Sequence, residues 1–452
     1  MTLNLSFLGG AGTVAGSRYL LERNGDAILV DVGLFQGLKQ HRLRNWARFQ
    51  KPPADIGAVV LTHAHIDHSG YLPALVRDGF AGPVYGSAAT VDLCGILLPD
   101  AAMLQEQDAA FANRHGFSKH KPALPLYTTA DAEVALKRLR RMPFAKPVKL
   151  PGGAEITLRR AGHILGAASV ECRWEGTTVV FSGDLGRPSD PIMLPPEPVA
   201  AADYLLVEST YGNRRHAAVD PTELLAAVVT ATTQRGGTLL IPAFAVGRAQ
   251  TLLYYLGRLA RAGRLAVPVY LDSPMAIDAA ALLAAHPDDH RLTPAECRDL
   301  AAVARYVRDP EGSKALTADP APKVIISASG MATGGRVLHH LKRYAPDPKS
   351  TVLFAGFQAA GTRGEAMVSG ATEIKIHGEY VPVRAEVKNL SELSAHADAD
   401  EVMAWLKAFR RPPKRTFVVH GEPVAADILR HRIEEELGWA AEVPEHLSTV
   451  LL

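Results

Sequence analysis

Three histidines and an aspartate crowd into one short stretch of the chain, His63-Ala-His65-Ile-Asp67-His68. In an extended loop His63 and His65 alternate to the same side, whereas the adjacent Asp67 and His68 diverge. Imidazole nitrogens and carboxylate oxygens bind Zn²⁺ best, with Mn²⁺ or Fe²⁺ as weaker candidates. The spacing therefore predicts a site that divides its ligands between two metal ions.

Two ions need further ligands, and three polar residues follow strands or lie in glycine-flanked loops. His163 lies in the segment Ala161–Gly166, Asp184 ends Val179–Asp184, and His420 lies at the end of the strand in Phe417–Gly421. Such a residue can also simply cap backbone groups, so each is a candidate ligand only in combination with the first cluster.

Short apolar runs of the buried-strand kind precede these residues and must position them. Residues 58–61 end directly before the histidine cluster, and similar junctions recur at 178–184, 204–208 and 416–420. We expect these four strand ends to converge on one edge.

The chain begins with strands at 3–8, 17–22 and 27–30, the last two joined by the hairpin signal Asn24-Gly25. The pair Gly10 and Gly12 with Asp31 mimics a dinucleotide fingerprint, but the hairpin leaves no room for the helix which that site requires. The glycines are therefore expected to form a turn.

From Tyr211 to about Gly370 the pattern changes to alternating helices and strands. We expect helices at 222–233 and 248–262 and strands at 238–241 and 269–272, which indicates an inserted α/β domain.

The chain has 452 residues, 47% hydrophobic and 21% charged, which is typical of a folded globular protein. The net charge of +2 identifies no partner, and the basic run 137–141 is interpreted as a solvated helix face. Cys94, Cys172 and Cys297 lack metal or disulfide spacing. The first residues show no signal segment, and no run reaches the length of a membrane helix, so we expect a cytoplasmic protein without a membrane partner.

The set His63, His65, Asp67, His68, His163, Asp184 and His420 resembles the signature of the metallo-β-lactamase fold. Glu208 in Val-Glu-Ser-Thr-Tyr-Gly-Asn, His396 in Ser391–Asp398, and His420 resemble the three additional motifs of the β-CASP nucleases. The segment Gly116–Pro125 is also similar to that family. The likeness spans essentially the whole chain and is greatest to the bacterial and archaeal relatives of the endonuclease subunit of the cleavage and polyadenylation specificity factor.

The resemblance implies an αββα sandwich formed by residues 1–211 and 370–452, with a β-CASP domain inserted at 212–369. It implies two Zn²⁺ per chain, one held by His63, His65 and His163 and the other by Asp67, His68 and His420, with Asp184 bridging both. Single-stranded RNA would lie between the domains. DNA-acting members that resemble Artemis tend to carry valine at the position of His420, so histidine favours RNA. Neither an added N-terminal RNA-binding domain nor the added C-terminal domain of ribonuclease J is expected.

Two metal ions make hydroxide available at neutral pH and neutralise charge in the transition state. The predicted catalytic residues are Asp67, Glu208 and His396. His396 resembles the general acid of the family, and Glu208 would keep it protonated and oriented. Asp31 is interpreted as a carboxylate behind the metal ligands, with strand capping as the alternative.

The glycine-rich loop 327–335 can form an anion-binding nest at a helix start. Its residues Ser329, Gly330 and Met331, together with Arg336, are the predicted substrate contacts. A plain turn is the alternative. Arg248 and the segment 356–363 are weaker candidates for lining an RNA channel, with helix capping as their alternative.

Three rival functions remain open from the sequence. A thioesterase or lactonase of the same core would not need Glu208, His396 or an inserted domain. A non-catalytic RNA-binding scaffold would not need the complete ligand set. A DNA nuclease is opposed only by His420. Cut-site preference, the balance of endonuclease and exonuclease action and the oligomeric state are left undetermined.

Overall fold

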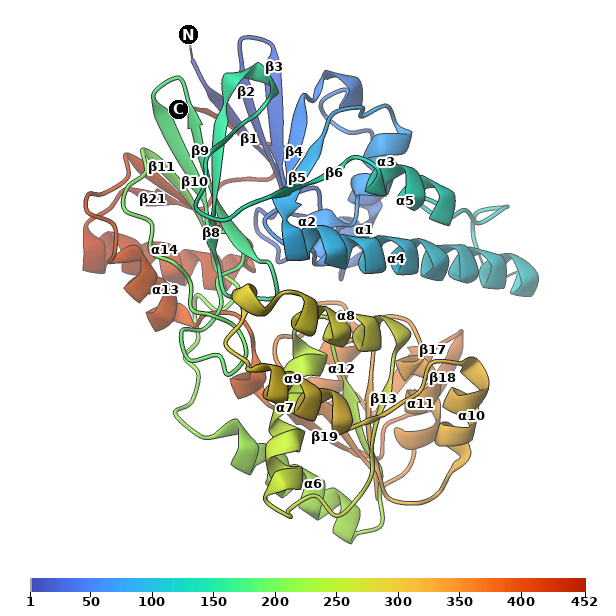
Figure 1. Cartoon of the computed structure of the whole chain (residues 1–452). Coiled ribbons are helices and arrows are strands. Elements are labelled where there is room, and N and C mark those ends of the chain that lie inside the picture. The colour runs from blue at the N-terminus through green and yellow to red at the C-terminus, as the bar shows by residue number, and fades with distance from the viewer. Residues whose placement is uncertain (1, 117) are drawn as a thin grey trace. The chain divides into compact units, whose positions relative to one another are not determined.

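The computed structural model describes residues 2–116 and 118–452 (Figure 1). Phe117, in the segment that resembles the family, lies outside the described residues. The chain divides into two compact units, residues 1–215 with 396–452, and residues 216–395. The second unit is thus inserted into the first, and each is described by itself.

The first unit contains two seven-stranded sheets. One mixes an antiparallel start with parallel pairing from β3 onward. The predicted hairpin is confirmed, with Asn24 at φ +55° in its turn. In spatial order the strands are β22 (Thr449–Leu451), β1 (Asn4–Gly9), β2 (Arg18–Arg23), β3 (Asp26–Val30), β4 (Ala58–Val60), β5 (Val84–Ser87) and β6 (Leu139–Met142).

The second sheet brings together the early and late parts of this unit. Its strand from the C-terminal segment, β20, pairs in parallel with β11, and β11 pairs in parallel with β10. In spatial order the strands are β21 (Ala441–Glu442), β20 (Arg415–Val419), β11 (Tyr204–Glu208), β10 (Thr177–Phe181), β9 (Ala168–Trp174), β8 (Glu155–Arg160) and β7 (Val148–Lys149).

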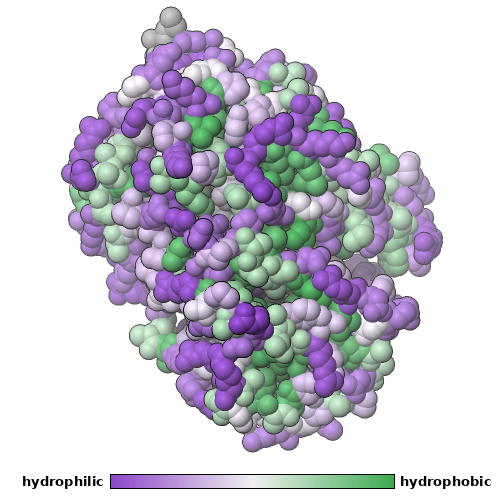
Figure 2. Space-filling view, in the orientation of Figure 1, coloured by the Kyte–Doolittle hydropathy of each residue, from purple (hydrophilic) through white to green (hydrophobic). Residues whose placement is uncertain are grey.

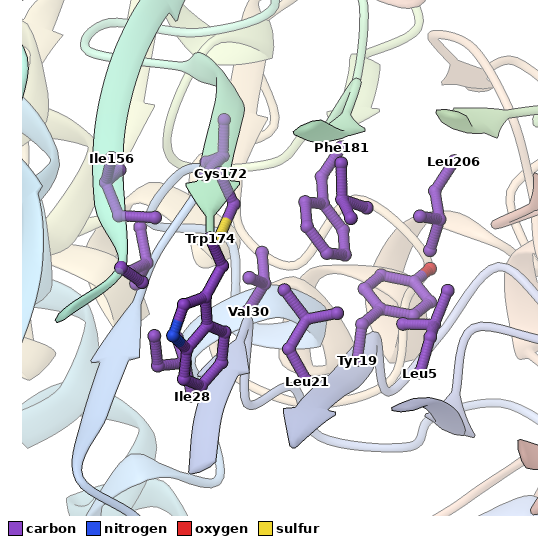
Figure 3. Packing of buried hydrophobic residues seen from close by; sticks show 14 of the residues in the cluster. Leu5, Tyr19, Leu21, Ile28, Val30, Ile156, Cys172, Trp174, Phe181 and Leu206 are labelled. Atoms are coloured by element: carbon purple, nitrogen blue, oxygen red, sulfur yellow. The ribbon is translucent and has the colours of Figure 1, made fainter. Parts of the chain in front are cut away.

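The two sheets face each other across a hydrophobic core. Figure 3 shows Tyr19, Leu21 and Ile28 of the first sheet against Trp174 and Phe181 of the second. Alternation along each strand sends every second side chain into this layer, which is how a sheet sandwich excludes water.

Helices cover the outer faces, which completes the predicted αββα sandwich. The helix α4 contacts β5 and β6, and α14 contacts β20 and β21. The capping residues explain where several helices begin: Ser87 caps α4, and Asp398 forms a capping box for α13. The helices are α1 (Lys39–Leu43), α2 (Ile66–Ser69), α3 (Leu72–Arg77), α4 (Ala88–His115), α5 (Thr129–Leu136), α13 (Ala399–Leu406) and α14 (Pro423–Leu437), with 3-10 turns η1 (Arg44–Trp46), η2 (Pro53–Asp55) and η3 (Pro151–Gly153).

The expectation that no segment has the length of a membrane helix is wrong for α4. By length and composition this helix of 28 residues could cross a membrane. A core helix passes the same test, and α4 packs on β5 and β6 and contains Pro99. On the face drawn in Figure 2, hydrophilic residues surround hydrophobic patches of limited extent.

The inserted unit is built on one parallel sheet of six strands. The order in which the strands are added to the sheet changes direction between β12 and β15. In α/β sheets, ligands bind beside such a point, at the carboxyl ends of the strands. In spatial order the strands are β14 (Arg305–Tyr306), β13 (Val269–Asp272), β15 (Val324–Ser327), β12 (Leu239–Pro242), β16 (Thr351–Phe354) and β19 (Glu386–Asn389).

Helices and a hairpin complete this unit. Asp220 caps α6, and Leu338, Leu341 and Tyr344 of α11 pack into the core against β15 and β16. The remaining elements are α6 (Pro221–Gln234), α7 (Arg248–Arg261), α8 (Pro274–Ala285), α9 (Pro294–Ala302), α10 (Pro310–Ala318), α11 (Val337–Tyr344), α12 (Arg363–Val368), the hairpin β17 (Glu373–Ile376) and β18 (Glu379–Pro382), and 3-10 turns η4 (Pro287–Asp289) and η5 (Ser391–Leu393).

The division of the chain differs from the predicted limits at 211/212 and 369/370. The inserted unit runs from His216 to Ala395. The second limit moves because β19 adds to β16 in the parallel sheet and because Ile374 and Val381 of the hairpin belong to the same core.

Candidate metal centre

The histidine cluster leaves the carboxyl end of β4 and enters a short helix. His63 and His65 lie in the loop, as predicted, whereas Asp67 and His68 lie in α2 rather than in extended chain. The helical turn places Asp67 and His68 in a second ligand group with His420, although the rings of His68 and His63 still pack with their centroids 4.1 Å apart. The cluster is therefore split into two groups by a change of backbone conformation.

One group of possible ligands comprises His63, His65, His163 and Asp184. One ligand atom from each lies within 4.8 Å of all the others. Nδ1 of His65 lies 3.2 Å from Nε2 of His63 and 3.2 Å from Nε2 of His163. Both of these Nε2 atoms lie 3.6 Å from Oδ2 of Asp184.

The other group comprises Asp67, His68 and His420, also within 4.8 Å of one another. Here the facing atom of Asp184 is Oδ1, which lies 3.3 Å from Nε2 of His68 and 3.6 Å from Nε2 of His420. Nε2 of His420 also lies 3.9 Å from Oδ2 of Asp67. The carboxylate of Asp184 thus presents one oxygen to each group.

The donors fit metal ions better than they fit one another. Nε2 of His68 and Oδ1 of Asp184 are buried and have no hydrogen-bond partner of acceptable geometry in the described part of the chain. Buried polar atoms left in this state are costly. Histidine nitrogens gathered around one buried carboxylate are the donor set that Zn²⁺ binds.

In His63, His68 and His420, the ring nitrogen that faces away from the centre is held by another side chain. Oδ2 of Asp31 lies 2.7 Å from Nδ1 of His68. The carboxylate of Asp31 also accepts hydrogen bonds from the backbone N–H of Thr62 at Oδ1 and from the Thr62 hydroxyl at Oδ2. The hydroxyl of Thr62 lies 3.1 Å from Nδ1 of His63, and that of Ser17 lies 2.8 Å from Nδ1 of His420. Such contacts fix ring orientation in metal sites.

Burial and charge set the protonation of these groups. Burial lowers the pKa of His63 and His163 well below 6.5, and it lowers the pKa of His420 to about 4. Burial alone would raise the pKa of Asp184, but His420 and the other histidines hold it well below its usual range. Neutral imidazoles and an ionised carboxylate are the forms that bind metals.

His68 is the exception among the possible ligands. Burial opposes a proton on its ring, but Asp184 and Asp31 raise the pKa of His68 well above 6.5. A metal ion facing Nε2 would displace that proton.

Glu208 and His396 form a third cluster with Asp184. Nδ1 of His396 lies 3.2 Å from both oxygens of Glu208 and 4.0 Å from Oδ2 of Asp184. Burial opposes a charge on the ring, but Glu208 raises the pKa of His396 above 6.5. Glu208 also accepts from the backbone N–H of Leu185, so the carboxylate is fixed in place.

The predicted glycine-rich loop follows β15 in the inserted unit. The hydroxyl of Ser329 accepts from the N–H groups of Thr333 and Gly334, and the carbonyl of Gly330 accepts from Gln358. Arg363 donates to the carbonyls of Ala332 and Thr333. The loop is therefore shaped by its own unit.

Arg336 is engaged inside the inserted unit. Its guanidinium donates to the buried carboxylate of Asp272 at 2.6 Å and to the carbonyls of Val307 and Arg308 at 3.1 and 2.6 Å. These bonds tie the start of α11, directly after the glycine-rich loop, to the end of β13. The predicted RNA contact of this side chain therefore competes with bonds that it already makes.

Several residues that shape the centre were not predicted. Ser17 and Thr62 carry no motif of their own, and only the neighbouring strand ends hint at them. Gly33 is required because a Cβ there would lie 1.6 Å from the carbonyl oxygen of Asp67. Asp31 and His420 have φ values of +59° and +48°, an uncommon conformation that is found often at functional sites.

The fold and the site together define a metal-dependent hydrolase of the metallo-β-lactamase class. The profile of the metallo-beta-lactamase superfamily matches residues 11–227, that of the Beta-Casp domain matches 249–367, and that of the Zn-dependent metallo-hydrolase RNA specificity domain matches 380–444.

Two kinds of relative are similar along nearly the whole chain. Ribonuclease TTHA0252 of Thermus thermophilus is 38% identical over 429 residues, which cover 92% of each chain. The transcription termination factor FttA of Pyrococcus horikoshii is 30% identical over 479 residues, which cover all of this chain and 71% of that protein. A protein of unknown function from Enterococcus faecalis shares the fold, with a TM-score of 0.53 at 14% identity over 100% of both chains. This chain belongs to the β-CASP family of the metallo-β-lactamase superfamily.

Proposed function

We propose that this protein is a ribonuclease that hydrolyses phosphodiester bonds of single-stranded RNA and uses two Zn²⁺ ions per chain. The observation that carries the proposal is the position of Asp184, whose two oxygens each face a separate group of histidine ligands. The similar Thermus protein is named a ribonuclease, and the profile that matches residues 380–444 is named for RNA specificity.

In this proposal His63, His65 and His163 would hold one ion, and Asp67, His68 and His420 would hold the other. The carboxylate of Asp184 would contribute to both. When bound, the two ions would supply hydroxide at neutral pH and neutralise the charge that develops on the phosphate. Asp31 acts through His68 by fixing the orientation of its ring.

His396 is the proposed general acid. With Nδ1 held by Glu208, Nε2 is the nitrogen that donates a proton to the leaving oxygen as the bond from phosphorus to that oxygen breaks. Glu208 is a positioning residue, because it stabilises the charged imidazole and leaves its outer nitrogen directed to the substrate. A carboxylic thioester or lactone would not need this second proton donor.

Ser329, Gly330 and Met331 are the proposed contacts to RNA phosphates. They lie at the carboxyl end of β15, where parallel sheets bind ligands. Arg336 is assigned to positioning this loop through Asp272. The free thiols of Cys94 and Cys172 are buried and suit the reducing cytoplasm, where we propose that the protein acts.

The test is cleavage of matched labelled substrates by the zinc-loaded full chain. Single-stranded RNA, the same sequence as DNA, and circular RNA are compared. If linear and circular RNA are both cleaved and the DNA stays intact, the protein is an RNA endonuclease. If only linear RNA is cleaved, the protein acts from an end of the RNA chain. Cleavage of DNA at the same rate would favour a DNA nuclease, and absence of cleavage with tight RNA binding would favour a scaffold.

A further inference from the structure

The segment after β3 carries positive charge that the metal centre does not use. Between Asp31 and Asp55 the sequence has five cationic residues and no acidic one. Lys51 pairs with Glu22 at 2.9 Å. Four others, Lys39, Arg42, Arg44 and Arg48, form no ion pair within residues 2–116 and 118–452.

This segment is fixed to the loop that supports the metal centre. Asn45 binds Phe35 through both backbone groups, at 2.9 and 2.8 Å. The N–H of Leu34, one residue earlier, donates to the carbonyl of Ile66 in the helix that carries Asp67 and His68. Hydrogen bonds therefore connect the cationic segment, through Phe35 and the adjacent Leu34, to the helix that carries two of the proposed metal ligands.

Two side chains with unsatisfied nitrogens, Arg44 and His446, meet at the ring of Phe35, and His41 lies close enough to interact electrostatically with both. The guanidinium of Arg44 packs over the ring of Phe35 at 5.4 Å, and the ring of His446 meets the same ring edge-on at 5.9 Å. Nη1 of Arg44, Nδ1 of His41 and Nδ1 of His446 are buried without a hydrogen-bond partner among the described residues. Nη1 of Arg44 is always a donor, and Nδ1 of each histidine donates in one tautomer, so a ligand with several acceptor oxygens would satisfy all three nitrogens.

Positive charge predominates in the electrostatic surroundings of His446. Burial and then the nearby Arg44, Arg18 and His41 lower the pKa of His446 to about 4. Burial and Arg44 lower the pKa of His41, and the carboxylate of Glu422 opposes that shift. A bound anion would favour the charged form of both imidazoles, which burial and the neighbouring cations oppose.

An aromatic side chain lies beside the cluster in the chain. Trp46 is 59% exposed and Leu43 is 56% exposed, although both are large and apolar. Single-stranded nucleic acid is bound by cationic grooves next to aromatic rings on which bases stack. This combination distinguishes the surface from a solvated charged face such as residues 137–141, where Arg140 donates to the backbone carbonyls of Lys137 and Leu139.

We propose that His41, Arg44 and His446 form a phosphate-binding subsite for the RNA backbone, with Trp46 as the platform for a neighbouring base. The subsite lies outside the metal centre, on the metallo-β-lactamase unit. This inference rests on the proposed ribonuclease function, since it names where that substrate is held beyond the bond that is cut.

The experiment measures binding rather than cleavage. Fluorescence anisotropy of a labelled single-stranded RNA is followed over a range of salt concentrations with the zinc-loaded His396→Ala chain, and a gel checks that the RNA stays intact. Arg44→Gln, His446→Gln and Trp46→Ala are made in this background. Arg140→Gln is the matched control for loss of a surface cation, and Arg44→Lys tests whether charge alone is needed.

We expect Arg44→Gln to weaken binding and to lower the slope of log affinity against log salt by about 0.7, the value for one lost phosphate contact on a single strand. Trp46→Ala should weaken binding about 5-fold or more without changing this slope. His446→Gln should weaken binding, and Arg44→Lys should retain the slope. Arg140→Gln should change neither quantity.

Equal affinity and slope for Arg44→Gln and Arg140→Gln, in a parent that binds RNA, would overturn the subsite and leave the ribonuclease proposal intact. If the His396→Ala parent does not bind RNA, and the chain with His396 restored does not cleave RNA, then both the subsite and the ribonuclease proposal are overturned. Retained RNA affinity in Arg44→Gln with lost binding to vesicles of anionic lipid would assign the surface to a membrane and also overturn it. The melting temperature of each variant shows whether a loss reflects misfolding.

Discussion

Both carboxylate oxygens of Glu208 lie 3.2 Å from Nδ1 of His396. Glu208 lies at the end of β11, and His396 follows 188 residues later. Nδ1 of His396 also lies 4.0 Å from Oδ2 of Asp184. A fixed carboxylate that holds Nδ1 in this way stabilises the protonated ring of His396, and its Nε2 can then deliver a proton during the reaction.

Replacing His396 with alanine should separate catalysis from metal binding. We expect the cleavage rate to fall about 10²- to 10⁴-fold, the usual contribution of a general acid. Zinc content should be unchanged, because the two groups of proposed ligands are complete without His396. Glu208→Gln should lower the rate less and shift the alkaline limb of the pH profile to lower pH, since the carboxylate raises the pKa of His396. A zinc-free His396→Ala protein would refute the separation.

Asp31 should control metal affinity without contacting the substrate. Asp31→Asn weakens the bond to Nδ1 of His68, and we expect zinc affinity to fall about 10- to 100-fold. Competition with a chromophoric chelator measures the affinity. Asp26→Asn, at the exposed start of the same strand, is the control and should behave as wild type. Equal affinity of the two variants would reduce Asp31 to a strand cap.

Arg336 should act through the fold of the glycine-rich loop. We expect Arg336→Ala to weaken RNA binding while the salt slope stays that of the parent, because its guanidinium is engaged by Asp272 and by backbone carbonyls. A direct phosphate contact would instead lower the slope by about 0.7. Anisotropy titrations at several salt concentrations separate the two roles.

Asp272 should stabilise the inserted unit in a pH-dependent way. Burial would raise the pKa of Asp272, but hydrogen bonds from His340, Ser313 and Arg336 hold it below 3.8. A depressed carboxyl pKa stabilises the fold above the unfolded value, and this stabilisation is lost as pH falls through the folded value. The difference in unfolding free energy between wild type and Asp272→Asn should be constant near neutral pH and shrink below about pH 4. Urea unfolding at several pH values tests this, and a constant difference down to acid pH would contradict it.

Ligands that lie close together in the sequence were easier to recognise than ligands that lie far apart. His63 to His68 form a local pattern, so their chemistry was visible directly. Asp184 and His420 are far apart in the chain and meet only because β10, β11 and β20 are neighbours in parallel. Strand-end reasoning proposed that convergence, and the family resemblance supplied the division of the ligands.

Other features could not be predicted because they depend on tertiary contacts without a sequence signature. Ser17 and Thr62 act through single hydroxyl groups, and nothing in their neighbours marks them. Arg336 follows a glycine-rich loop, which suggested phosphate binding, yet its partner Asp272 is buried at the end of another strand. The placement of β19 in the parallel sheet of the inserted unit could not be predicted, because a short, half-polar strand that joins a sheet edge has no strong periodicity.

The central claim is that Asp184 joins two metal ions in a centre that cleaves RNA. The most direct measurement determines zinc by mass spectrometry and cleavage of labelled single-stranded RNA on the same preparations of wild type and Asp184→Ala. We expect about two zinc ions per wild-type chain, and we expect the folded variant to lose both metal and cleavage. An Asp184→Ala protein that keeps two ions and full activity would contradict the claim.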